Sequence, residues 1–137
     1  MRLSVFLLLA NLRYYCRNMS DTFVYQKNSA SACFITVPNI ELAKKLAHGI
    51  VSNNLAACVN IIPGLTSVYS WENKIQEDNE LLLMVKTKTN KVDELSKFIR
   101  ENHEYSVAEV ISTPIENGNA PYLKWIHDTV PEPKENE

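Results

Sequence analysis

The sequence predicts a mixed α+β domain with the element order β-α-β-β-α-β and a short C-terminal helix. Short runs of strand-forming residues end at proline, glycine or polar turns. Two longer segments between them carry apolar residues every three or four positions, as amphipathic helices do. This order is typical of the ferredoxin-like split β-α-β arrangement.

The first half of the pattern is a strand followed by a helix. Residues 31–37 (SACFITV) form an apolar run that Pro38 closes, and Asn39 suits a helix N-cap. In residues 40–52 apolar pairs recur every four positions, which predicts one buried helix face. Asn53 and Asn54 provide a C-terminal stop.

The middle of the chain predicts two further strands. Residues 56–63 (AACVNIIP) form an apolar strand that Pro63 and Gly64 end. Residues 66–75 alternate, so that Ser67, Tyr69 and Trp71 share one face. Residues 76–79 (QEDN) are expected to form a polar turn before the long strand ELLLMVKTK, residues 80–88.

The second half repeats the strand and helix pattern. Asn90 and Asp93 resemble a capping box ahead of a second amphipathic helix. Residues 106–115 (SVAEVISTPI) are expected to form a fourth strand that ends near Pro114. Asn119 is the expected cap of the last helix, which has Pro121 in its first turn.

The chain of 137 residues suggests one domain, expected at residues 29–130. Residues 1–28 are interpreted as a leader or disordered segment. The run MRLSVFLLLA resembles a secretory signal, the arginines up to Arg17 fit a mitochondrial leader as well, and translation from Met19 would omit most of it. The core domain itself is expected in the cytoplasm. Residues 131–137 (PEPKENE) are expected to be a disordered tail.

Composition narrows the classes of function. The net charge of -2 and the lack of a Lys/Arg cluster argue against a nucleic-acid partner. Three cysteines without CxxC spacing match no zinc finger or disulfide framework, so Cys33 and Cys58 are interpreted as small buried residues. The sequence contains no Ser/His/Asp arrangement and no phosphate loop, so its motifs do not indicate an enzyme.

The long strand is apolar on both faces. Leu81 and Leu83 lie on one face, and Leu82 and Met84 on the other. Two helices cover only one face of such a sheet, so the other is expected to meet another copy of the chain. The sequence therefore predicts a homo-oligomer.

Four segments, LAACVNIIPGLTSVYSWENKI, ELLLMVKT, HEYSVAEVI and YLKWI, resemble the CutA family of divalent-cation-tolerance proteins. The resemblance covers residues 31–129. It implies a ferredoxin-like homotrimer, similar in architecture to the PII signalling trimers, whose hairpins reach across to neighbouring subunits. It further implies a role in binding and tolerance of copper or another divalent cation, with no required cofactor and no catalysed reaction.

The resemblance also implies site residues. Glu80 matches a metal ligand of bacterial members, Ile35 and Asn102 stand where those members have Cys and His, and His103 is adjacent. His103, Tyr105 and Glu109 match three positions of an H-P-Y-x-x-P-E-like motif of the family. The expected metal ligands are therefore His103, Glu80 and Glu109. A cleft between subunits is expected to include the following side chains: Cys58, Trp71, Lys86, Tyr105 and Trp125.

Two interpretations remain open. In the first, the subunit clefts bind a divalent metal ion or a small ligand. In the second, the trimer is a PII-like scaffold for a protein partner, as eukaryotic relatives are tied to the handling of acetylcholinesterase, and the polar cluster around His103 and Glu109 is a hydrogen-bonded turn.

Overall fold

The computed structural model describes residues 22–133, and the expected leader lies mostly outside this range. The first half contains β1 (Ala30–Val37), α2 (Ile40–Ser52) and β2 (Cys58–Trp71). The second half contains β3 (Lys74–Lys88), a 3₁₀ turn at Thr89–Lys91, α3 (Val92–Asn102), β4 (Ile111–Ile115) and α4 (Ala120–Thr129). The predicted α+β order is confirmed.

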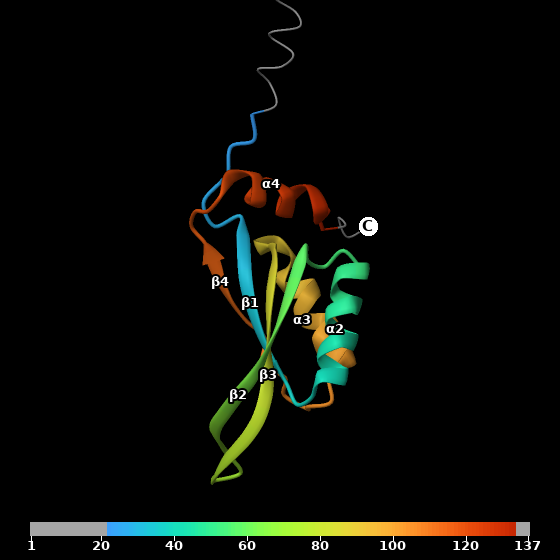
Figure 1. Ribbon diagram of the computed structural model, residues 1–137, viewed down its shortest axis with the longest axis vertical. Helices are drawn as coiled ribbons and strands as arrows, with labels where there is room; N and C mark the ends of the chain where they lie inside the picture. The colour runs from blue at the N-terminus through green and yellow to red at the C-terminus, as the bar shows by residue number, and fades with distance from the viewer. Residues whose placement is uncertain (1–21, 134–137) are drawn as a thin grey trace, which may run out of the picture.

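The four strands form one antiparallel sheet in the order β2-β3-β1-β4. Helices α2 and α3 lie side by side on one face of this sheet, and α4 lies across one end (Figure 1). The main core is enclosed between the sheet and the two helices, where Ile35, Leu83 and Ile99 are fully buried. Cys33 is buried there too, as expected. The other face, called the open face below, is not covered by α2 or α3.

Helix α2 begins as the sequence predicts. The Asn39 side chain accepts a 2.8 Å hydrogen bond from the amide of Leu42, and Asn53 is the C-cap. Helix α3 begins differently, because a 3₁₀ turn precedes it and makes Lys91 the N-cap. The capping box at Asn90 and Asp93 is therefore wrong, and the Asn90 amide instead donates to Glu132.

Pro63 and Gly64 do not end β2, contrary to expectation. The strand continues to Trp71, and its pairing with β3 shifts between Ile62 and Leu65. This shift is a β-bulge: three residue steps on β2, from Ile62 to Leu65, oppose two steps on β3. Gly64 adopts φ +84 there, and Pro63 is tolerated because β2 is an edge strand.

The hairpin turn also differs from the prediction. Residues 76–79 belong to β3, and the chain reverses at Glu72 and Asn73, whose φ angles are 49 and 60. Two consecutive positive φ values match a two-residue hairpin turn whose twist suits the strands. The alternation of Ser67, Tyr69 and Trp71 is confirmed, because these residues follow the bulge without a further shift. The hairpin projects past the helical layer (Figure 1).

The fourth strand is shorter than expected. Pairing with β1 starts at Ile111 opposite Phe34, and residues 103–110 form a loop after α3. Ala108 and Val110 turn into the core from this loop, which removes them from a regular strand. Asn119 precedes α4 as predicted, although its side chain makes no capping hydrogen bond.

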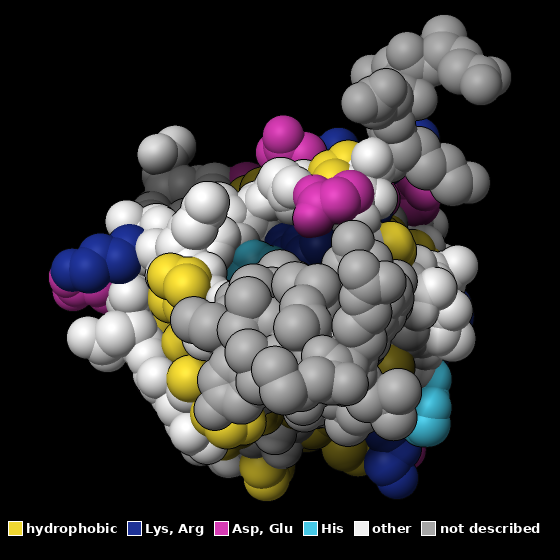
Figure 2. All heavy atoms as spheres, turned by 90° about the horizontal axis from the view of Figure 1, so that it is seen from above, with side chains coloured by type: hydrophobic (Ala, Val, Ile, Leu, Met, Phe, Trp, Pro, Cys, Tyr) yellow, Lys and Arg dark blue, Asp and Glu magenta, His cyan; other side chains and the backbone are white. Residues whose placement is uncertain are grey.

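The packed part of the chain extends past both expected boundaries. Phe23 and Tyr25 pack against the buried side of α4, and the Tyr25 hydroxyl donates to the carbonyl of Ile115. Glu132 in the expected tail pairs with Lys88. At this end of the molecule acidic and basic side chains are interspersed over the visible described surface (Figure 2).

Candidate functional site

A hollow of about 590 Å³ lies on the open face, where the hairpin leaves the sheet. It takes side chains from β1, β2, β3 and the loop after α3. The lining residues are Thr36, Ser67, Tyr69, Trp71, Glu80, Glu104, Tyr105, Ser106, Val107 and Glu109.

The β-bulge brings the β2 side chains to this hollow. Before the bulge Ile62 pairs with Leu82, and after it Leu65 pairs with Glu80. Because directly opposed residues in an antiparallel pair share a face, the extra residue changes which β2 positions face the same way as Glu80. Without the bulge, Tyr69 and Trp71 would point to the opposite side of the hairpin.

Glu80 is the buried acid of the hollow, with 7% of its surface exposed. Its two carboxylate oxygens have different donors: the Tyr105 hydroxyl donates to Oε1 at 3.1 Å, and the Ser67 hydroxyl donates to Oε2 at 2.5 Å. These bonds supply part of the solvation that burial removes from a carboxylate. Glu80 therefore joins β2, β3 and the loop after α3.

His103 anchors the same loop. Its Nδ1 accepts a 3.0 Å hydrogen bond from the Tyr105 amide, which leaves Nε2 to carry the proton and donate to the Thr36 carbonyl at 2.9 Å. The His103 ring also packs against the Tyr105 ring, with centroids 4.8 Å apart. Both ring nitrogens are thus engaged. His103 lines a neighbouring hollow with Asn102 and Glu104, and not the one that contains Glu80.

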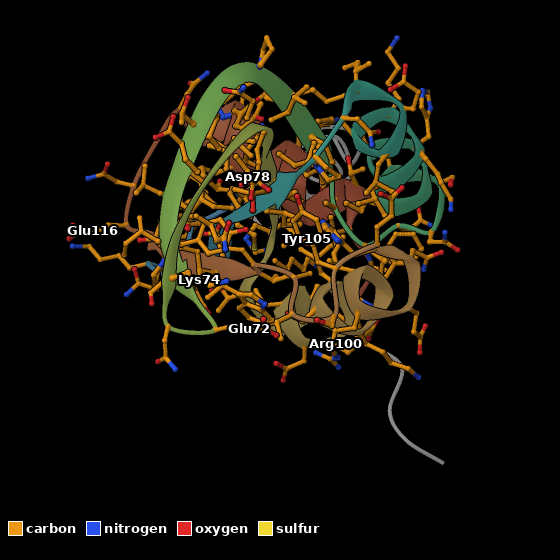
Figure 3. The ribbon with its side chains drawn as sticks, turned by 90° about the horizontal axis from the view of Figure 1, so that it is seen from below. Glu72, Lys74, Asp78, Arg100, Tyr105 and Glu116 are labelled. Atoms are coloured by element: carbon orange, nitrogen blue, oxygen red, sulfur yellow. The ribbon has the colours of Figure 1, made fainter. Side chains whose placement is uncertain are left out.

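The electrostatic character of the hollow is acidic. Its lining includes Glu80, Glu104 and Glu109 and no Lys, Arg or His. Desolvation and the hydrogen bond to Glu80 raise the pKa of Tyr105 to about 12. The hydrogen bond to Asp78, at 2.6 Å, raises the pKa of Tyr69. Viewed from the hairpin end, Tyr105 lies near the centre of the molecule and Arg100 lies out on α3 (Figure 3).

Three expected cleft residues lie at the other end of the open face. Cys58 is opposite Lys86 in the sheet register and lies close to Tyr122 of α4. Desolvation is the main cause of the raised pKa of Tyr122, and Cys58 raises it further. The Lys86 ammonium donates to the Asn60 side chain and the Met84 carbonyl. Trp125 lies against Tyr122, with ring centroids 5.3 Å apart. The structure thus separates these residues from Trp71 and Tyr105.

The expected metal ligands are only partly brought together. Glu80 and Glu109 share the hollow, whereas His103 lies outside it. Within residues 22–133, no cluster of three or more His, Cys, Asp or Glu side chains is arranged to hold a metal ion. Cys33 and Ile35 are fully buried on the opposite face, so no thiol reaches the hollow from β1.

Several hollow residues were absent from the sequence prediction. Ser67 and Tyr69 had been placed on one strand face, but nothing in the sequence linked that face to Glu80. The link depends on the bulge at Pro63 and Gly64, which the sequence prediction treated as the end of a strand. A prolyl-glycyl pair followed by renewed alternation is the signal that indicates an edge-strand bulge.

These features define an α+β protein of the ferredoxin-like class with an acidic, aromatic-lined hollow on its open sheet face. The chain belongs to the CutA1 family: the family model described as "CutA1 divalent ion tolerance protein" matches residues 31–129. No described helix is long and apolar enough to cross a bilayer.

The relatives agree in sequence and in fold. A Xenopus laevis CutA homolog is 53% identical over 82% of this chain and 74% of its own length. The human protein CutA is 51% identical, and the match covers 74% of this chain but 57% of that protein, so the chain spans less than two thirds of it. CutA1 from Oryza sativa superimposes with a TM-score of 0.74 at 48% identity, covering 76% of this chain and 95% of the other. The divalent cation tolerance protein from Thermus thermophilus superimposes with a TM-score of 0.73 at 43% identity, covering 74% of this chain and 99% of the other.

Proposed function

We propose that this protein takes part in divalent-cation tolerance by binding a divalent ion in the Glu80 hollow. Family membership and the carboxylates of Glu80 and Glu109 in one hollow support the proposal. Because the hollow offers oxygen ligands and no thiol, it favours a divalent ion over Cu(I). Among divalent ions the Irving–Williams order places Cu(II) first. The proposed role is binding, with no catalysed reaction.

One protomer supplies too few ligands by itself, so we propose that a homotrimer completes the site. The open face carries the apolar side chains Ile62 and Ile111, which are 41% and 57% exposed, and Phe34 lies opposite Ile111. Burial of this face against other copies would place the hollow at the edge of a subunit contact. Water or a neighbouring copy would supply the remaining ligands.

His103 has a positioning role in this proposal. Coordination through either ring nitrogen would require one of its two hydrogen bonds to break, leaving the Thr36 carbonyl or the Tyr105 amide without its present partner. By holding these groups, His103 keeps the Tyr105 side chain directed at Glu80. The ion then contacts Glu80 and Glu109.

Calorimetry on the full chain with Cu(II), Zn(II) and Cd(II) tests the proposal. E80Q and E109Q should each weaken binding by about tenfold or more, since each amide is a weaker ligand than the carboxylate it replaces. The matched control is E77Q, because Glu77 is an exposed acid of β3 outside the hollow. Binding weaker than about 100 μM for all three ions would contradict the proposal and favour the scaffold interpretation.

The pH dependence distinguishes the ligand type. Imidazole ligands lose metal as they protonate near pH 6, whereas a carboxylate-only site keeps its metal down to about pH 4–5. We expect the second behaviour. A loss of binding centred near pH 6 would make His103 a ligand and contradict its positioning role.

For location, we propose an organellar or secreted protein that carries a leader within residues 1–28. The relatives from Oryza sativa and Arabidopsis thaliana are described as chloroplastic. Fusion of residues 1–28 to a fluorescent protein tests the proposal: transport of the fusion into an organelle or the secretory route would support a leader, and a diffuse cytoplasmic signal would contradict it.

A further inference from the structure

The proposed divalent-ion site does not use the faces of the aromatic rings that line the hollow. Tyr69, Trp71 and Tyr105 all line the hollow and are 42%, 47% and 38% exposed. Three large aromatic side chains gathered at one hollow expose more apolar surface than isolated surface residues do. Their arrangement therefore needs an explanation beyond packing within the protomer.

Hydrogen bonds fix two of these rings. The Tyr69 hydroxyl donates to Asp78 at 2.6 Å, and the Tyr105 hydroxyl donates to Glu80 at 3.1 Å. A phenol that donates to a carboxylate is polarised, so its ring becomes richer in electrons. Rings fixed in this way are suited to attract a cation over their faces.

Charge in the hollow adds to the same preference. Glu80, Glu104 and Glu109 are part of the lining, which contains no Lys, Arg or His. An anion or an acidic peptide would meet three carboxylates there, and a neutral apolar molecule would gain nothing from them. A positively charged guest with an apolar surface would use both the rings and the carboxylates.

We propose that the hollow binds a small organic cation of the alkylammonium class, with Trp71, Tyr69 and Tyr105 around its apolar groups and Glu109 near its charge. Aromatic side chains next to carboxylates are the general solution for such cations. The volume of about 590 Å³ falls within the usual range for small-molecule sites. This ligand class goes beyond the divalent-ion proposal and depends on the aromatic wall, which a metal ion does not need.

Titration of the full chain with tetramethylammonium chloride, followed by backbone amide NMR shifts, tests the inference. We expect saturable shifts at residues 104–107 and at the Trp71 indole, with millimolar affinity as for exposed cation–π contacts. tert-Butanol is a neutral probe with a similar apolar surface, and sodium chloride at equal ionic strength controls for salt. Saturable shifts of equal size with tert-butanol, or no shift with tetramethylammonium, would overturn the inference.

Variants separate this site from the divalent-ion site. W71L should weaken tetramethylammonium binding about fivefold or more, W71F should retain most of it, and both should bind Cu(II) as the wild type does. The matched control is Y122L, because Tyr122 is similarly exposed on α4 outside the hollow. Unchanged binding in W71L would refute the aromatic site even if metal binding persists. A hollow filled by a second copy would show no shift and would also refute it.

Discussion

The Tyr105 hydroxyl donates a 3.1 Å hydrogen bond to Oε1 of Glu80 and thereby ties the loop after α3 to β3. The Ser67 hydroxyl occupies the other oxygen, so three separate segments meet at one buried carboxylate. His103 holds the near end of the loop through the Thr36 carbonyl. The shape of the hollow therefore depends on a short chain of polar contacts.

The first prediction concerns this contact. Y105F should lower the free energy of unfolding by about 0.5–1 kcal/mol, because a hydrogen bond to a carboxylate is lost at a partly exposed position. E80Q should also destabilise the fold, since it changes the acceptor of two hydroxyl groups. Urea denaturation of both single variants and of Y105F/E80Q gives a double-mutant cycle. Additive effects of the two substitutions would show that the contact contributes nothing to stability.

The second prediction concerns the β-bulge. Gly64 adopts φ +84, and apart from Gly64 and its two chain neighbours no heavy atom lies within 4 Å of a Cβ added there, so G64A is disfavoured by its backbone conformation alone. We expect a loss of about 1 kcal/mol in the free energy of unfolding. G118A is the matched control: a Cβ there would meet Leu123 at an ordinary 3.5 Å. G64A should also weaken the binding of a divalent ion in the hollow, and G118A should leave that binding unchanged.

The fold was largely predictable because periodicity reports burial. Alternation in β1 and the four-residue repeat in α2 reflect faces that Ile35 and Leu46 bury completely. The bulge was missed because Pro63 and Gly64 also fit the end of a strand, and only the renewed alternation after them favours an edge-strand bulge. The turn at Glu72 and Asn73 was missed for a related reason: it lacks glycine, the usual residue at positive φ.

The site was only partly predictable. Residue types drew attention to Glu80 and Tyr105, and the structure brings these two side chains together. They could not distinguish a metal-ligating His103 from one whose ring nitrogens both hold backbone groups, because that depends on the Thr36 carbonyl far away in the sequence. The aromatic wall depends on strand register, which a single shifted residue reverses.

The third prediction concerns assembly. If the open face joins copies of the chain, I62D/I111D should dissociate the oligomer, because carboxylates would be buried without partners. The molecular mass measured by light scattering should then fall from about three times the chain mass to the 15.6 kDa of one chain. V51D is the control, since Val51 is exposed to a similar extent on α2, away from the open face. A wild-type chain that is already monomeric at micromolar concentration would contradict the trimer.

The fourth prediction concerns pH and His127 on α4. Burial is the main cause of the lowered pKa of His127, and Lys88 lowers it further, while Glu132 and Asp128 oppose the shift. Its ring also contacts Phe23 and Ser29. The folded state binds a proton at His127 less readily than the unfolded state does. The contribution of His127 to the free energy of unfolding is therefore complete above pH 6.5 and declines as the pH falls.

Chemical denaturation at several pH values between about 5 and 7.5 measures this effect. The wild type should lose stability on acidification through this range, and H127Q should show a smaller slope, because the unfolded and folded states then bind the same number of protons at this position. H48Q, a substitution on the exposed surface of α2, is the control and should keep the wild-type slope. Equal slopes for the wild type and H127Q would show that burial of His127 does not govern the acid sensitivity of the α4 end.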